Sequence, residues 1–336
     1  MVSVIRSELA ATTADGVRLS IQRLTPQGGA RRGPVVLQHG LGSNGLAFMV
    51  PGVSFAEHLC GLGYDCFVPD LRGAGKSERP RRPYSLDDYL DHDIPTILAT
   101  ALEASGAPAV RWVGHSMGGI LMWMHGIEHP DAKVSRLVTV ASALDYRPGR
   151  SVYRTLNALL PYFGFIGTVP FGLIARLHSL FAGSGPILLP EGMNFFRSNI
   201  DRQVCRAIMA GGFGPIPVSL FKSLASTFTD RGFARRNGEI AYLERAADFR
   251  IPTLLLGGSR DPQCTVEAAT HTAELLSAVR DKQLMLFGKP YGHADDYGHF
   301  DLLVGKRATT EVWPHITAFL GAADSPSDAA GAMMAR

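Results

Sequence analysis

Short apolar runs alternate with helix-like segments along two stretches of this 336-residue chain, and this alternation restricts the fold more than any other feature. Such runs are typical of strands buried on both faces of a parallel sheet. Residues 7–26 instead alternate in polarity and turn at Asp15-Gly16, which predicts an antiparallel hairpin. The sequence therefore predicts an α/β fold with a mainly parallel sheet, an initial antiparallel hairpin and helices on both faces. Strands are expected at residues 34–40, 64–70, 109–115, 134–144, 253–258 and 282–288, and helices at 54–63, 85–106 (kinked at Pro95), 117–129, 266–280 and 302–320.

The alternation stops after Leu144 and resumes near residue 252. The residues between are rich in Leu, Phe, Gly and Pro, which makes them too apolar for a linker and too broken for a sheet. We interpret them as an inserted cap over the carboxyl edge of the strands, where open α/β sheets bind ligands. The predicted organisation is a core of residues 1–145 and 248–321, a cap of residues 146–247 and a flexible tail of residues 322–336.

Charge and cysteine content restrict the partners and the compartment. The chain has 33 Lys+Arg against 30 Asp+Glu, and because these charges are interspersed we expect no nucleic-acid partner. The amino terminus lacks an apolar segment of secretory-signal length, and no C-x-x-C spacing occurs among Cys60, Cys66, Cys205 and Cys264. We therefore expect reduced thiols and a cytoplasmic protein.

One uncharged stretch, residues 155–175, has about the length of a membrane span. Its prolines and glycines would break a lone helix repeatedly, and unsatisfied backbone groups are not tolerated in lipid. We expect a buried or surface-clamping apolar element here and no integral membrane segment.

A serine lies between two glycines in GHSMGG, residues 114–119, where a predicted strand meets a predicted helix. The chain must bend sharply at Ser116, and Gly114 and Gly118 remove Cβ atoms that would collide across the bend. Such a turn presents the hydroxyl to a bound carbonyl, with the Met117 amide directed at the developing oxyanion. We predict that Ser116 is a nucleophile; the alternative is an ordinary Gly-Ser-Gly turn.

A nucleophilic serine needs a base, and the base needs an orienting carboxylate. The loop after strand 253–258 offers Asp261, and the loop after strand 282–288 offers His293 and His299. We favour His299 because it directly precedes the final helix, with Asp301 near the start of that helix. Asp145, just past strand 134–144, is the reserve acid, and His293 can also be read as a solvated loop residue.

The loop QHGLGSNG, which follows strand 34–40, should supply the second oxyanion donor, which we predict to be the Leu41 amide. His39, Gly40 and His115 border the predicted site and are expected to line the substrate; alternatively, the histidines fill hydrogen-bonding positions in its wall. Gly40, Gly42 and Gly45 also spell the dinucleotide motif G-x-G-x-x-G, but LAFMVPG follows where that motif needs a helix. We expect no cofactor, and because the eleven histidines form no H-E-x-x-H motif we expect no metal.

These residues resemble the α/β-hydrolase superfamily in its capped serine esterase and lipase branch. The resemblance implies the α/β-hydrolase fold, a triad of Ser116, Asp261 and His299, and oxyanion donors at Leu41 and Met117. Serine at position 116 separates the chain from haloalkane dehalogenases and epoxide hydrolases of this fold, which use aspartate, and from polyester synthases, which use cysteine. The motifs that carry the resemblance are HGLG at 39–42, DLRGAGKS at 70–77, GHSMGG at 114–119, SRDP at 259–262 and GHFDLLVG at 298–305.

The sequence thus predicts a cofactor-free carboxylic ester hydrolase that acts through an acyl-enzyme. The apolar cap implies a small-molecule hydrophobic ester as substrate. A thioesterase, a lactonase or an acyltransferase with the same triad is an alternative, and so is a non-catalytic binding protein on this fold. The apolar cap could also be a homodimer surface.

Overall fold

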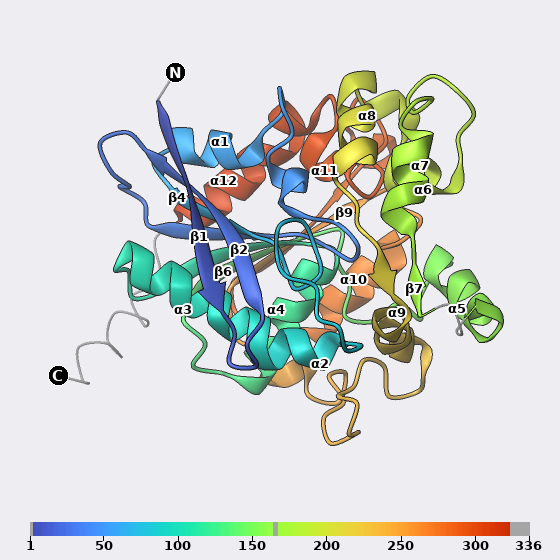
Figure 1. Cartoon of the computed structure of the whole chain (residues 1–336), viewed down its shortest axis with the longest axis horizontal. Coiled ribbons are helices and arrows are strands. Elements are labelled where there is room, and N and C mark those ends of the chain that lie inside the picture. The colour runs from blue at the N-terminus through green and yellow to red at the C-terminus, as the bar shows by residue number, and fades with distance from the viewer. Residues whose placement is uncertain (1–2, 164–166, 323–336) are drawn as a thin grey trace.

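An eight-stranded sheet forms the centre of the computed structural model, which describes residues 3–163 and 167–322 (Figure 1). The strand order is β1-β2-β4-β3-β5-β6-β9-β10. The hairpin of β1 and β2 is antiparallel, β2 pairs antiparallel with β4, and the other neighbours are parallel, as predicted. The strands are β1 (Val4–Thr12), β2 (Arg18–Pro26), β3 (Pro34–Gln38), β4 (Asp65–Pro69), β5 (Val110–His115), β6 (Val134–Val140), β9 (Thr253–Gly258) and β10 (Lys282–Phe287).

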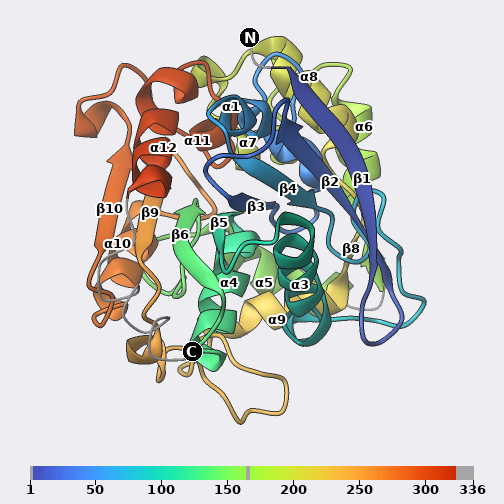
Figure 2. The ribbon, with the colours of Figure 1, turned by 90° about the vertical axis from the view of Figure 1, so that its left-hand side faces the viewer.

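Helices cover both faces of this sheet. Helices α1 (Phe55–Gly61) and α12 (Trp313–Gly321) lie on one face, and α3 (Ile94–Ser105), α4 (Met117–Glu128) and α10 (Val266–Leu275) lie on the other (Figure 2). Every residue of β3, β4 and β9 is buried. Burial on both faces explains why these strands are continuous apolar runs rather than alternating ones.

The two longest predicted helices are each interrupted. Residues 85–106 form α2 (Leu86–Asp88), a wide helical turn at Tyr89–Asp93, and then α3, which has Pro95 near its start. Residues 302–320 divide into α11 (Asp301–Val304) and α12, with extended backbone at Gly305 between them and Pro314 in the first turn of α12. Proline has no amide hydrogen to donate and clashes with the preceding turn, so each helix restarts close to its proline.

Residues 146–247 contribute most of the elements that lie outside these layers, at the right of Figure 1. A bridge joins Phe213 to Ser43, and the Gly214 amide donates to the Gly42 carbonyl at 2.8 Å. This segment therefore packs against the loop that follows β3. Its elements are α5 (Val152–Phe163), β7 (Thr168–Val169), α6 (Phe171–His178), α7 (Leu189–Asn194), α8 (Arg202–Gly211), β8 (Ile216–Pro217) and α9 (Val218–Ala225).

Among the helices that the structure describes, none is both long enough and apolar enough to cross a membrane. All of the predicted tail except residue 322 lies outside the described residues. The division into core, cap and tail stays a prediction.

Candidate active site

Ser116 lies at the turn between β5 and α4, in a backbone conformation that residues with a Cβ rarely adopt. Its φ is 53° and its ψ is −121°. A Cβ on Gly114 would come within 2.4 Å of the backbone of Gly118, and a Cβ on Gly118 would come within 2.3 Å of the Gln38 carbonyl oxygen. The two glycines therefore let α4 start directly against β5 and β3, and strain of this kind is typical of functional sites.

The loop after β3 lies against the same turn. A Cβ on Gly40 would be 2.8 Å from the Cβ of Ser116. The Ser43 amide donates to the Gly40 carbonyl at 3.2 Å, which closes a tight turn with Gly42 at a φ of +64°. The Leu41 amide takes no part in the turn, loop and cap hydrogen bonds of the described residues, and the Met117 amide is in the first helical turn, where it has no intrahelical acceptor.

His299 and Asp261 meet in the loops after β10 and β9. The Nδ1 atom of His299 lies 2.7 Å from Oδ2 of Asp261, and both side chains are buried. The other carboxylate oxygen of Asp261 accepts from the amides of Gln263, at 2.8 Å, and Cys264, at 3.0 Å. The carboxylate is thus held by its own loop and orients the imidazole, which is the arrangement a general base requires.

The reserve residues lie elsewhere. Asp145 is paired with the guanidinium of Arg147 at 2.8 Å and faces His271 at 3.4 Å. His293 packs on the ring of Phe287, with Nδ1 3.3 Å from the carbonyl of Gly288. Neither makes a hydrogen bond with Asp261 or His299 within the described part of the chain. The geometry therefore favours Asp261 and His299 over the alternatives.

His115 links the nucleophile's turn to the loop of His299. Its Nε2 donates to the His299 carbonyl at 3.1 Å, and the two rings are 4.7 Å apart. No hydrogen bond joins Ser116 Oγ to the His299 ring in the ranges described, and such bonds often tighten only when substrate binds. Burial lowers the pKa of His115 well below its usual value, so the ring stays neutral.

His39 has both of its ring nitrogens engaged. Nε2 accepts from the Leu71 amide at 3.0 Å, which leaves Nδ1 to donate to the Gly40 carbonyl at 2.9 Å. Burial also lowers the pKa of His39. These contacts favour the reading in which His39 and His115 are hydrogen-bonded wall residues that shape the site.

Asp301 has a larger structural role than its position near a helix start indicated. Its Oδ2 accepts from the amides of Phe196 and Gly298, each at 2.7 Å, and thereby ties the loop of His299 to residues before α8. Its Oδ1 has no hydrogen-bond partner among residues 3–163 and 167–322. Burial raises the pKa of Asp301 to about 7. No sequence pattern indicates this contact, because Phe196 is 105 residues away.

Two apolar cavities share part of their walls, and Ser116 lines the first of them. The first, of about 30 Å³, is lined by Ser116, Leu41 and Met117 together with aromatic and aliphatic side chains of residues 146–233. The second, of about 350 Å³, extends between α5, α6 and α7. The shared residues are Leu41, Tyr153, Leu156 and Phe221. Concave apolar cavities with a few polar groups are typical of small-molecule sites.

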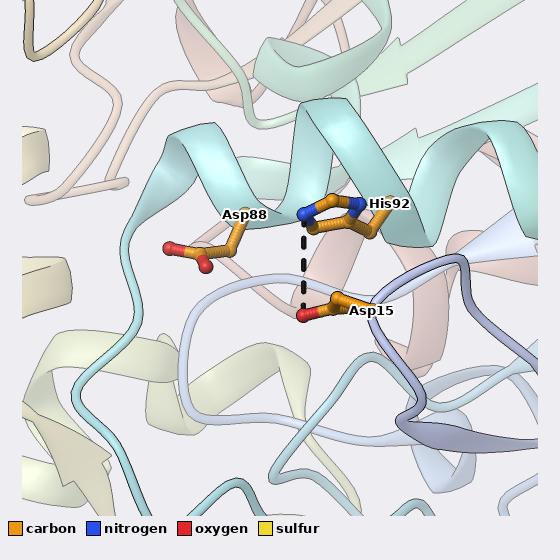
Figure 3. A group of neighbouring side chains, drawn as sticks. All are labelled: Asp15, Asp88 and His92. Carbon is orange, nitrogen blue, oxygen red and sulfur yellow. Dashed lines mark ion pairs between the residues drawn. The ribbon is translucent and has the colours of Figure 1, made fainter.

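One group of side chains has the spacing of metal ligands, although it lies in a different part of the molecule. Asp15, Asp88 and His92 bring their ligand atoms within 4.8 Å of one another (Figure 3). Both carboxylates are already ion-paired: Arg72 and Arg82 contact each of them. Because the guanidinium groups neutralise the carboxylates, the group reads as a salt-bridge network.

Comparisons with known proteins agree with this fold. A family model described as alpha/beta hydrolase fold matches residues 33–163. Epoxide hydrolase A of Mycobacterium tuberculosis is 30% identical over 290 residues, which cover 78% of this chain and 85% of that protein. Lipase 1 of Drosophila melanogaster is 32% identical over 118 residues, but the match spans only 26% of the lipase.

Among solved structures, an esterase from Exiguobacterium antarcticum superposes with a TM-score of 0.63 at 17% identity, covering 94% of this chain and all of the esterase. A likeness at that identity concerns the fold. Taken with the sequence matches, it shows that the chain belongs to the α/β-hydrolase superfamily.

Proposed function

We propose that this chain is a serine hydrolase that cleaves hydrophobic carboxylic esters through an acyl-enzyme. Ser116 Oγ attacks the ester carbonyl while His299 Nε2 takes its proton. Asp261 holds Nδ1 of the imidazole and stabilises the cation that forms. The alcohol leaves with the proton from His299, and a water activated by the same ring then releases the acid.

The amides of Leu41 and Met117 stabilise the tetrahedral oxyanion. Support comes from the adjacency of Gly40 to Ser116 and from the absence of a turn, loop or cap partner for either amide in the described residues. Preorganised donors of this kind contribute more to the rate in a site that excludes water.

The observation that carries the proposal is the 2.7 Å contact of His299 with Asp261, in a loop that His115 joins to the strained turn of Ser116. The apolar cavity that Ser116 lines, and the larger one that shares its walls, support a hydrophobic substrate. Epoxide hydrolysis is disfavoured despite the named relative, because the nucleophile position here is serine. The four cysteines are buried free thiols, which supports a reducing compartment.

Hydrolysis of a chain-length series of p-nitrophenyl esters, by wild type and Ser116→Ala side by side, tests the proposal. Turnover that rises with acyl length and vanishes in the variant is expected. Equal turnover in the variant would exclude Ser116 as nucleophile. If no ester is cleaved but a serine-directed fluorophosphonate still labels the protein, the triad serves a narrower thioesterase, lactonase or acyltransferase.

A further inference from the structure

Exposed apolar side chains are concentrated in one region. Of the twelve large apolar side chains that are exposed in the described residues, nine lie between residues 159 and 189. We call the following six, on α6, α7 and the turn between them, the apolar face: Leu173, Leu177, Leu180, Phe181, Leu188 and Leu189. Contiguous exposed patches of this kind usually mark an interaction site.

In this region polar side chains are buried and large apolar side chains are exposed to solvent. His178 of α6 and Glu191 of α7 are buried, and they contact each other at 2.8 Å. Arg197 also pairs with Glu191. The polar side chains thus hold α6 and α7 together from within, while Leu177 and Phe181 are 61% and 57% exposed. Because these buried polar contacts fix how α6 and α7 pack against each other, the exposed leucines are held facing outward by the fold.

The larger cavity reaches the same region. Leu159, Ile174 and Leu189 line that cavity and are also among the exposed apolar residues. Through Leu41 and Tyr153 the cavity shares walls with the one that contains Ser116. A hydrophobic molecule that leaves an apolar surface at this face would therefore enter the larger cavity, which shares walls with the cavity that Ser116 lines.

The charged side chains near the apolar face indicate what kind of surface it would contact. Between residues 151 and 225 the exposed charged side chains are basic except for Asp201; the basic ones are Arg154, Arg176, Arg202 and Lys222. Arg176 is on α6 between Leu173 and Leu177, and Arg202 packs against Gly183 beside Phe181. Arg176 and Arg202 thus form a basic rim beside the apolar face, and basic side chains next to an apolar surface favour anionic lipid headgroups.

We infer that the apolar face, with its basic rim, docks on an anionic lipid surface and draws hydrophobic substrate from it into the cavity. The docking rests on the exposed residues alone, whereas the delivery of substrate rests on the function proposed above. Helices α6 and α7, which carry most of the apolar face, lie on the right of Figure 1 together with the other elements of residues 146–247.

Co-sedimentation with vesicles tests the docking. Wild type is expected to sediment with vesicles of equal parts phosphatidylcholine and phosphatidylglycerol, and much less with phosphatidylcholine alone or in high salt. Leu177→Asp and Phe181→Asp should each weaken partitioning at least about tenfold, because an exposed apolar anchor is lost and a negative charge is added. Neither residue lines a cavity, so turnover of a soluble short ester should stay unchanged.

Ile5→Asp is the matched control. Ile5 is 55% exposed on β1, outside the apolar face, and its change adds the same charge. We expect this variant to bind vesicles as wild type does. Ser116→Ala should also bind them while cleaving no ester. If wild type bound the vesicles but cleaved no ester, the proposed function would be refuted and the docking would be left intact.

Two results would overturn the inference. The first is a wild type that does not sediment with the anionic vesicles, or a Leu177→Asp variant that sediments as well as wild type. The second is a dimer in solution that Leu177→Asp converts to a monomer, without vesicle binding by wild type; the face would then join two copies of this chain.

Discussion

His299 Nδ1 and Asp261 Oδ2, which belong to residues 38 positions apart in the chain, lie 2.7 Å from each other, and both side chains are buried. Parallel strands β9 and β10 bring their loops together there. Asp261 is anchored by two further amides, so the contact is fixed before any substrate binds. The proposed role of His299 as general base depends on this contact.

Substitution of Asp261 and of Asp145 should show which of the two carboxylates orients the catalytic base. Asp261→Asn keeps the shape but removes the charge and disturbs the tautomer of His299, so we expect kcat to fall by about 10³ to 10⁴. Asp145→Asn should leave kcat within about twofold, because Asp145 is engaged with Arg147 and makes no hydrogen bond to His299 in the described structure. Steady-state kinetics on one ester would check both; the opposite ranking would make Asp145 the triad acid.

The base is tested in the same way. His299→Ala should remove nearly all turnover, because no other imidazole is held by Asp261. His293→Ala should retain most of it, since His293 only packs on Phe287 and contacts Gly288. Should His293→Ala instead be the inactive variant, the assignment of the base would be reversed.

Removal of the nucleophile should cost little stability. Ser116→Ala keeps the Cβ in the same strained conformation and removes a hydroxyl for which the described residues provide no hydrogen bond. We expect the free energy of unfolding to stay within about 0.5 kcal/mol of wild type, with turnover lost. Urea unfolding followed by fluorescence measures the first quantity; a large loss of stability would mean that the hydroxyl has a structural role.

The turn itself is tested at Gly118. A Cβ there would lie 2.3 Å from the Gln38 carbonyl oxygen, which is backbone and has little room to move. Gly118→Ala should destabilise the fold by about 3 kcal/mol or more through overpacking. Gly61→Ala, at the end of α1, is the control, because its Cβ would meet nothing within 4 Å. Equal stability of the two variants would contradict the close approach of α4 to β3.

Asp301 should make stability depend on pH. Burial raises its pKa from 3.8 to about 7 in the folded state, so between these values the folded chain holds a proton that the unfolded chain releases. Stability from this group is therefore greatest at low pH and is lost as the pH rises to about 7. Asp301→Asn can still accept from Phe196 and Gly298 but does not titrate.

Unfolding free energies of wild type and Asp301→Asn across this pH range measure the effect. The stability of wild type relative to the variant should fall as the pH rises toward 7, because only wild type must ionise a buried carboxyl. A difference that is constant with pH would show that Asp301 is already ionised at low pH in the folded protein.

The sheet was predictable because its strands bury both faces. Residues such as Val36 and Leu255 lie in unbroken apolar runs, and helices between the runs leave few topologies open. The interruptions near Pro95 and Gly305 were harder to predict, because a periodic pattern continues across them while the backbone does not. Helix ends depend on local hydrogen bonds that the pattern does not contain.

The proposed catalytic residues could be named from the sequence because each follows a strand of the sheet. Ser116, Asp261 and His299 occupy loops at one sheet edge, and their chain order is typical of this fold. The contacts of Asp301 with Phe196 and of Gly42 with Gly214 could not be predicted. Both contacts join residues that are more than a hundred positions apart in the chain. In each, one partner lies within residues 146–247, where no regular hydrophobic pattern occurs.

Fluorophosphonate labelling followed by peptide mass spectrometry tests whether Ser116 is a nucleophile activated by His299. We predict one adduct, on the peptide that contains Ser116. It should form in wild type, be absent from Ser116→Ala and form much more slowly in His299→Ala. A folded wild-type protein that forms no adduct, or an adduct that persists in Ser116→Ala, would contradict the assignment of Ser116 as a nucleophile activated by His299.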